Sequence, residues 1–102
     1  MKKIIGGKLY NTETAELIDS YSNGLSNNDF HCIREGLYRK KTGEFFLYGW
    51  GGANTRYGEQ VGSNTWCGGE AITPLTEADA KAWLERYADA DVYIECFGEP
   101  EE

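Results

Sequence analysis

Residues 36–52 read GLYRKKTGEFFLYGWGG, and this pattern decides the fold of the chain. Its densest apolar run, residues 45–48, places large apolar side chains at both odd and even positions. Because successive strand residues point to opposite faces, this run is typical of a central strand that is covered on two sides. Residues 41–43 predict a three-residue turn with Gly43 in the left-handed conformation. The resulting hairpin pairs Lys40 with Glu44, Tyr38 with Phe46 and Leu37 with Leu47.

Length and composition indicate one folded domain spanning residues 1–102. The chain is 40% hydrophobic and 14% aromatic, which argues against disorder and allows a core without disulfides or metals. No apolar stretch reaches the length of a bilayer span, so no membrane association is expected. The first residues, MKKIIGG, lack the long apolar segment of a signal peptide, and a cytoplasmic location is therefore expected.

The net charge of −7 is concentrated in the C-terminal third. Residues 1–69 contain eight Lys/Arg and seven Asp/Glu, whereas residues 70–102 contain two and ten, a net charge of −8. This balance disfavours direct nucleic-acid binding. The simplest interpretation is that the acidic residues maintain solubility. The alternative is an acidic face that docks on a basic partner, such as the nucleic-acid channel of another protein.

The N-terminal part predicts further antiparallel strands. Gly6-Gly7 between two short apolar segments indicates a hairpin. Residues 14–21 predict a strand with Leu17 and Tyr21 on its apolar face, although Asp19 falls on that face as well. Residues 30–35 are expected to extend the central hairpin as a continuous strand. The basic residues near its tip can either protect an exposed turn or contact phosphate: Arg34, Arg39, Lys40 and Lys41.

Residues 49–69 are rich in glycine and predict an ordered, irregular loop. They lack the third glycine of a dinucleotide-binding motif and the Gly-Lys-Ser/Thr ending of a P-loop, so we reject nucleotide binding. Large aromatic and cationic side chains on an adaptable backbone are typical of protein–protein hot spots. The candidate interface residues in this segment are Trp50, Arg56, Tyr57 and Trp66.

The C-terminal third predicts helices. Residues 70–73 favour a short strand that stops at Pro74, and Thr76 is the expected N-cap of a helix. The apolar positions of this helix follow helical spacing: Ala80, Trp83, Leu84 and Tyr87. Glu77 and Glu85 lie on the solvent-exposed face of this helix and complete the set of candidate interface residues. Asp91 is the expected cap of a second helix ending at Gly98, with a strand over 91–97 as the alternative.

The sequence carries no catalytic or metal-binding motif. The three cysteines form no Cys-x-x-Cys pair, the only histidine is His31, and we expect reduced thiols, no metal and no cofactor. Cys67, followed by two glycines, is the best candidate nucleophile, but it needs His31 as an activating base.

Three segments resemble small proteins encoded on phages and conjugative elements of Gram-positive bacteria: residues 3–15, 37–49 and 72–80. Small acidic proteins of such elements often block host defence nucleases, anti-CRISPR proteins among them. The resemblance implies a genetic context and no catalytic residues.

The expected fold is α+β: an antiparallel sheet built on hairpins, with a C-terminal helix and a possible second short helix packed on one face. The leading functional hypothesis is a non-catalytic, anti-CRISPR-like inhibitor of a bacterial defence nuclease, such as an RNA-guided nuclease, that acts through protein–protein contact. The alternatives are a small nucleic-acid-binding accessory factor that uses the basic hairpin tip, and a Cys–His hydrolase.

Overall fold

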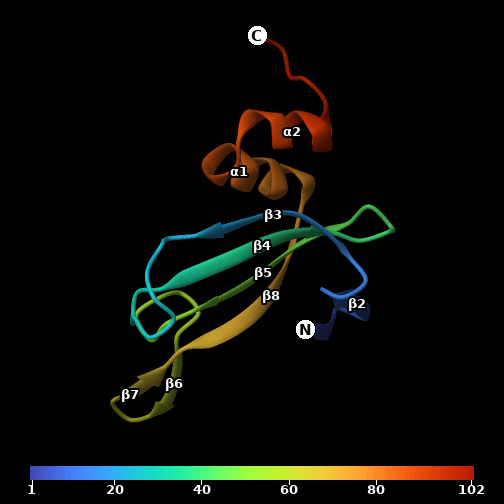
Figure 1. Ribbon diagram of the computed structural model, residues 1–102. Helices are drawn as coiled ribbons and strands as arrows, with labels where there is room; N and C mark the ends of the chain where they lie inside the picture. Colours follow the sequence, from blue (N-terminus) through green and yellow to red (C-terminus); the bar gives the residue numbers. More distant parts are fainter.

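The computed structural model describes residues 1–102 and confirms the α+β class (Figure 1). A four-stranded antiparallel sheet has the order β3-β4-β5-β8, and two small hairpins, β1–β2 and β6–β7, extend from it. The strands are β1 Lys2–Ile5, β2 Lys8–Asn11, β3 Glu16–Ser22, β4 Ile33–Arg39, β5 Phe45–Gly51, β6 Glu59–Gly62, β7 Thr65–Cys67 and β8 Gly69–Leu75. The helices are α1 Glu77–Tyr87 and α2 Ala90–Phe97.

The central hairpin β4–β5 forms as predicted. Tyr38 lies opposite Phe46 and Leu37 opposite Leu47. The Lys40 N–H donates to the Glu44 carbonyl at 2.8 Å, and Gly43 adopts a φ of 94°. A positive φ is strained for side chains with a Cβ, which explains the glycine at this turn.

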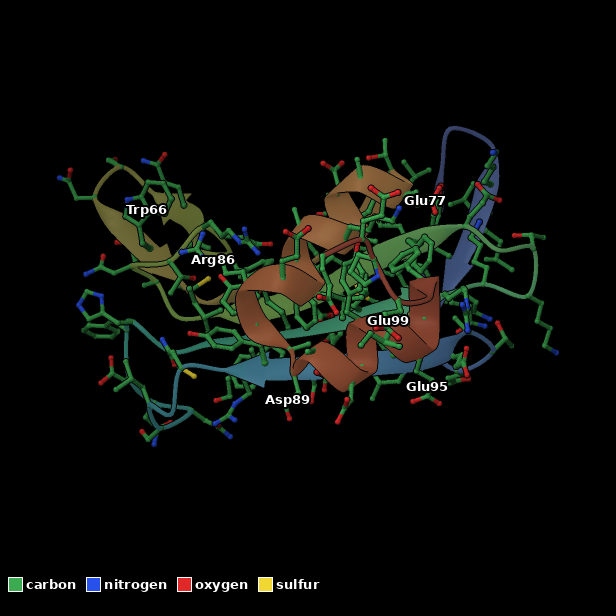
Figure 2. The ribbon with its side chains drawn as sticks, turned by 90° about the horizontal axis from the view of Figure 1, so that it is seen from above. Trp66, Glu77, Arg86, Asp89, Glu95 and Glu99 are labelled. Carbon is green, nitrogen blue, oxygen red and sulfur yellow. The ribbon has the colours of Figure 1, made fainter.

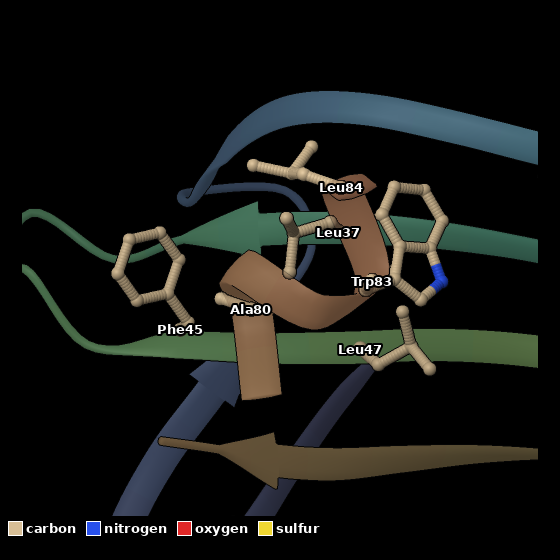
Figure 3. Packing of buried hydrophobic residues seen from close by; sticks show 6 residues of the cluster. All are labelled: Leu37, Phe45, Leu47, Ala80, Trp83 and Leu84. Carbon is tan, nitrogen blue, oxygen red and sulfur yellow. The ribbon is translucent and has the colours of Figure 1, made fainter. Parts of the chain in front are cut away.

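Strand β5 is covered on both faces over residues 45–47, as its continuous apolar run predicts. On one face, Phe45 and Leu47 join residues of β4 and α1 in the larger hydrophobic cluster (Figure 3). On the other face, Phe46 packs against Tyr10 of β2 and Ile72 of β8. The helices therefore cover one face of the sheet, and the β1–β2 hairpin covers part of the opposite face (Figure 1).

Helix α1 begins at a capping box. The Thr76 hydroxyl accepts from the Asp79 N–H at 3.1 Å, and the Asp79 carboxylate accepts from the Thr76 N–H at 3.4 Å. Ala80, Trp83 and Leu84 are buried against the sheet, which confirms the predicted apolar face. The capping box satisfies two of the free N–H groups at the start of the helix.

Helix α2 forms, so the strand alternative over 91–97 is wrong. Its N-cap is Asp89, two residues before the predicted Asp91, and the Asp89 side chain makes no capping hydrogen bond. Gly98, with a φ of 87°, ends the helix as predicted. The helix packs through its apolar side against the larger cluster.

Strand β3 departs from the predicted alternation. The register with β4 shifts between Leu17 and Asp19, which marks a β-bulge. The extra residue reverses the alternation, so Ile18 and Tyr21 pack against the helix-side cluster while Leu17 is 51% exposed. The prediction that Leu17 and Tyr21 share one face is therefore wrong.

Three strand boundaries also differ from the predictions. Strand β4 begins at Ile33 instead of residue 30. Asp29 starts a turn in which its side chain and its carbonyl accept hydrogen bonds from the His31 and Cys32 N–H groups. Strand β8 continues through Pro74, which an edge strand tolerates because one side of its backbone needs no partner. Residues 49–69 are not irregular throughout, since they include the end of β5 and the β6–β7 hairpin.

Candidate functional site

The predicted interface residues do not form one surface. Trp50 lies on the sheet face opposite the helices, across β4–β5 from Arg34. Arg56 and Tyr57 belong to the turn between β5 and β6, on the helix side of the sheet. Trp66 lies on β7, and Glu77 and Glu85 lie on α1. The sequence grouped residues 50, 56, 57 and 66 because they are close along the chain, and the fold separates them.

Tyr57 is part of the interior. It is 8% exposed, and its hydroxyl donates to the Glu35 carboxylate at 2.5 Å. The other Glu35 oxygen accepts from Trp83 Nε1 at 3.1 Å, and Arg56 forms an ion pair with Glu35 from the solvent side. Glu35 is only 4% exposed, and its buried carboxylate is satisfied by one donor from α1, one donor from the loop and the positive charge of Arg56. A Tyr57 side chain held in this way is not available to a partner, contrary to the expectation for this loop.

Burial raises the pKa of Tyr57, an effect that the neighbouring Arg56 charge partly opposes. The phenol therefore stays neutral and acts as a hydrogen-bond donor to Glu35. The network ties residues 55–57 to both β4 and α1, and it leaves no buried side-chain polar atom unpaired.

The glycines of this region explain how the loop reaches the sheet. A Cβ on Gly49 would overlap the Tyr57 phenol ring, and a Cβ on Gly51 would overlap the Thr55 hydroxyl. A Cβ on Gly69 would meet the Tyr57 carbonyl oxygen at 2.5 Å. The sequence indicated an adaptable, partner-binding loop, but these glycines instead allow close backbone packing.

The second cluster surrounds Trp50 on the opposite face. The Arg34 guanidinium lies 5.4 Å from the Trp50 ring centroid. Beside it, the Tyr48 hydroxyl donates to Glu70 at 2.5 Å, and this bond to a carboxylate raises the Tyr48 pKa to about 12. Trp50 and Tyr48 are half-buried, so they present ring surface to solvent while anchored to the sheet.

The β6–β7 hairpin extends from the body of the molecule at the end of the sheet away from the β1–β2 hairpin (Figure 1). Trp66 is 54% exposed and Val61 is 62% exposed. Trp66 lies opposite Gln60, next to a register shift that interrupts the two short strands. Trp66 is therefore the most exposed of the three aromatic residues predicted in this loop, as expected of a side chain that is available to a partner.

Helices α1 and α2 and the C-terminal tail form an acidic helical surface. All its carboxylate residues are exposed: Glu77, Asp79, Glu85, Asp89, Asp91, Glu95, Glu99, Glu101 and Glu102. Figure 2 shows Glu77, Asp89, Glu95 and Glu99 distributed over the helical layer, with Arg86 on the side nearer Trp66. The basic residues here are Arg86 and Lys81, whose Nζ lies 3.7 Å from Glu77. The surface therefore has a strong negative excess.

The cations near the central hairpin tip are largely engaged within the protein. Lys40 Nζ lies 3.8 Å from the Tyr10 ring centroid and 3.7 Å from Glu44. Lys8 also donates to Glu44 at 2.9 Å, and this contact raises the Lys8 pKa and lowers that of Glu44. Arg39 pairs with Glu16 at 2.8 Å. Few charges thus remain for a phosphate-binding site at the tip.

The three cysteines are free thiols in different surroundings. Cys32 is buried and its Sγ donates to the Leu25 carbonyl, while Cys96 lies beside Arg39. Cys67 is exposed on β7, and the residue opposite it is Glu59. The structure contains no group of three or more His, Cys, Asp or Glu residues that could hold a metal ion.

Comparison of the chain with protein-family models, with curated proteins and with solved structures found no match. The helices are too short and too polar for any of them to cross a bilayer. The functional argument therefore rests on the surfaces described above.

Proposed function

We propose that this protein is a non-catalytic, cytoplasmic inhibitor from a mobile genetic element that binds a bacterial defence nuclease. The observation that carries the proposal is the acidic helical surface, on which exposed carboxylates from α1, α2 and the tail outnumber Lys81 and Arg86. A nuclease channel that binds a phosphate backbone is basic, so the two surfaces are complementary in charge.

The rigid support of this surface favours binding over a purely solubilising role. Helix α1 is capped at Thr76 and anchored to the sheet through Trp83, so the backbone that carries its carboxylates is held in one position. Long-range attraction from such a surface raises association rates and makes them sensitive to salt. Trp66, exposed on the neighbouring β6–β7 hairpin, adds an aromatic side chain of the type that contributes to hot spots.

The test begins with affinity capture from a host lysate that contains intact defence systems, followed by mass spectrometry and a cleavage assay of the retained nuclease. The charge-reversal variant combines Glu85→Lys with Glu95→Lys, because neither residue belongs to the α1 cap. The matched control combines Glu13→Lys with Asn28→Lys, exposed residues outside both the helical surface and the β6–β7 hairpin.

We expect the wild type and the control to block cleavage, and the helical variant to associate at least about 10-fold more slowly at low salt. Trp66→Ala should increase the dissociation rate. If no nuclease is retained and inhibited, or if both charge-reversed variants inhibit as well as the wild type, the proposal is wrong.

A further inference from the structure

The sheet face opposite the helices is only partly covered. The β1–β2 hairpin packs over Phe46 and Ile72 and leaves the other end open. We call this uncovered part the open sheet face; it contains Leu17, Ser20, Ser22, Arg34, Gly36, Tyr38, Tyr48 and Trp50. Together with Tyr21 and Glu35, whose side chains pack on the helix side, these residues line a hollow of about 410 Å³ that is open to solvent. Its volume is sufficient for a nucleobase with its sugar.

Aromatic side chains from two neighbouring strands border the hollow. Trp50 lies at one end beside Arg34, and Tyr38 lies at the other, where its ring stacks on Phe46 at 5.2 Å between centroids. Tyr48 lies between Phe46 and Trp50 on the same face of β5. Half-buried aromatic rings on a rigid sheet provide stacking surfaces without a large loss of side-chain entropy on binding.

Arg34 is held in place before any ligand binds. Its guanidinium donates to the Ser22 hydroxyl at 3.1 Å, the Asn27 side-chain oxygen at 2.8 Å and the Leu25 carbonyl at 3.3 Å. None of these acceptors carries a charge, so the positive charge of Arg34 is not neutralised by a local ion pair. A fixed guanidinium next to an indole ring suits a phosphate attached to a stacked base.

The open sheet face has few charges beside its aromatic rings: Arg34 lies beside Trp50, and Glu70, opposite Trp50 on β8, is bonded to the Tyr48 hydroxyl. Lys2 and Lys3 are exposed on the β1–β2 hairpin, which lies on the side opposite the helices (Figure 1). The acidic helical surface, with nine carboxylates and two cations, lies on the other side of the sheet and accounts for the net charge of −7. The net charge therefore does not describe the open sheet face, where attraction of a phosphate depends on Arg34.

We propose that the open sheet face binds single-stranded nucleic acid, with bases stacked on Trp50 and the neighbouring tyrosines and a phosphate on Arg34. The five residues of β4 from Arg34 to Tyr38 span about 13 Å, which matches roughly two nucleotides of an extended strand. A duplex keeps its bases stacked inside and cannot use these rings. A protein partner would need a complementary apolar surface, whereas the fixed cation and exposed serine hydroxyls favour a polar, anionic strand.

The experiment measures fluorescence anisotropy of a labelled oligothymidylate of about 12 nucleotides, a length within the usual range for one site. We expect binding at low salt that weakens as salt increases. Trp50→Ala and Arg34→Gln should each weaken it by about 10-fold or more, while Trp50→Tyr should retain most of the affinity. Trp66→Ala is the matched control and should bind as the wild type does. Thermal melting checks that each variant is folded.

Three results would overturn the proposal. The first is no binding of the oligonucleotide at low salt. The second is binding that Trp50→Ala leaves unchanged, or equal binding of heparin or duplex, which would show attraction by charge alone. The third is equal affinity for thymidine monophosphate, which would show a mononucleotide site instead of a strand-binding surface. Because these measurements use no nuclease, their outcome is independent of the proposed inhibitory function.

Discussion

The two faces of the central sheet use similar residue types for different purposes. On the helix face, Trp83, Tyr57 and Arg56 converge on Glu35 and exclude it from solvent. On the open face, Trp50, Tyr48 and Arg34 remain half-buried. The first group stabilises the fold, and the second remains available for contact.

The difference arises from what covers each face. Helix α1 and the turn between β5 and β6 meet over Glu35, so each donor there has a defined acceptor. The β1–β2 hairpin is too short to cover the whole of the other face. Whether an aromatic side chain is buried in the core or accessible to a partner therefore depends on which element packs over it. The following predictions test this contrast.

The largest effect is expected for Trp83→Ala. Trp83 is buried in the larger cluster and also donates to Glu35. Truncation should reduce the free energy of unfolding by about 3–5 kcal/mol, the range for large aromatic residues in cores. Urea denaturation measures this change. A loss below about 1 kcal/mol would place Trp83 outside the core.

Gly49→Ala should have the next largest effect. The new Cβ would displace the Tyr57 ring, whose hydroxyl is held by Glu35, and we expect a loss of about 2–3 kcal/mol.

The matched control for Gly49→Ala is Gly36→Ala, in the neighbouring strand on the open face. Its Cβ would meet Tyr38 Cε2 at 3.0 Å and Leu17 Cδ1 at 3.2 Å. Leu17 is half-exposed and can move, so we expect a change within about 1 kcal/mol. Equal losses for the two variants in urea denaturation would contradict the contrast between the faces.

Glu35→Gln should destabilise the protein by about 1–3 kcal/mol. The amide keeps the volume of the carboxylate, but one acceptor oxygen is replaced by an NH₂ group that faces existing donors. The Arg56 ion pair is lost as well. Thermal unfolding at neutral pH measures the loss, with Glu70→Gln as an exposed control. A variant as stable as the wild type would show that the network contributes little.

The smallest effect is expected for the dependence of stability on the ionisation of Tyr48 at high pH. Its pKa is raised to about 12 by the bond to Glu70, so the folded protein holds this proton more tightly than the unfolded chain does. The stabilisation is complete below the ordinary tyrosine pKa of about 10 and is lost as pH rises towards about 12.

Ultraviolet titration of the tyrosines checks this prediction. Tyr48→Phe should remove one late-titrating group, and Glu70→Gln should shift that group to lower pH. If both variants give the same titration curve as the wild type, Tyr48 is not the late-titrating tyrosine.

Several elements were predictable because their signals are local. The apolar run at 45–48, the turn at Gly43 and the spacing of Ala80, Trp83 and Leu84 each depend on residues close along the chain. These patterns were sufficient for the α+β class, the central hairpin and α1.

Only the tertiary structure decided which aromatic residues are available for binding. Trp50 and Tyr57 are both aromatic residues and lie seven positions apart in one glycine-rich segment. Trp50 nevertheless lies on the open sheet face, whereas Tyr57 is buried. The bulge after Leu17, the contact between Glu35 and Trp83, and the packing of Tyr57 on Gly49 all join residues that no periodic pattern relates. Periodicity reports the conformation of one element, whereas burial depends on which element packs against it, and that information lies in contacts between distant parts of the chain.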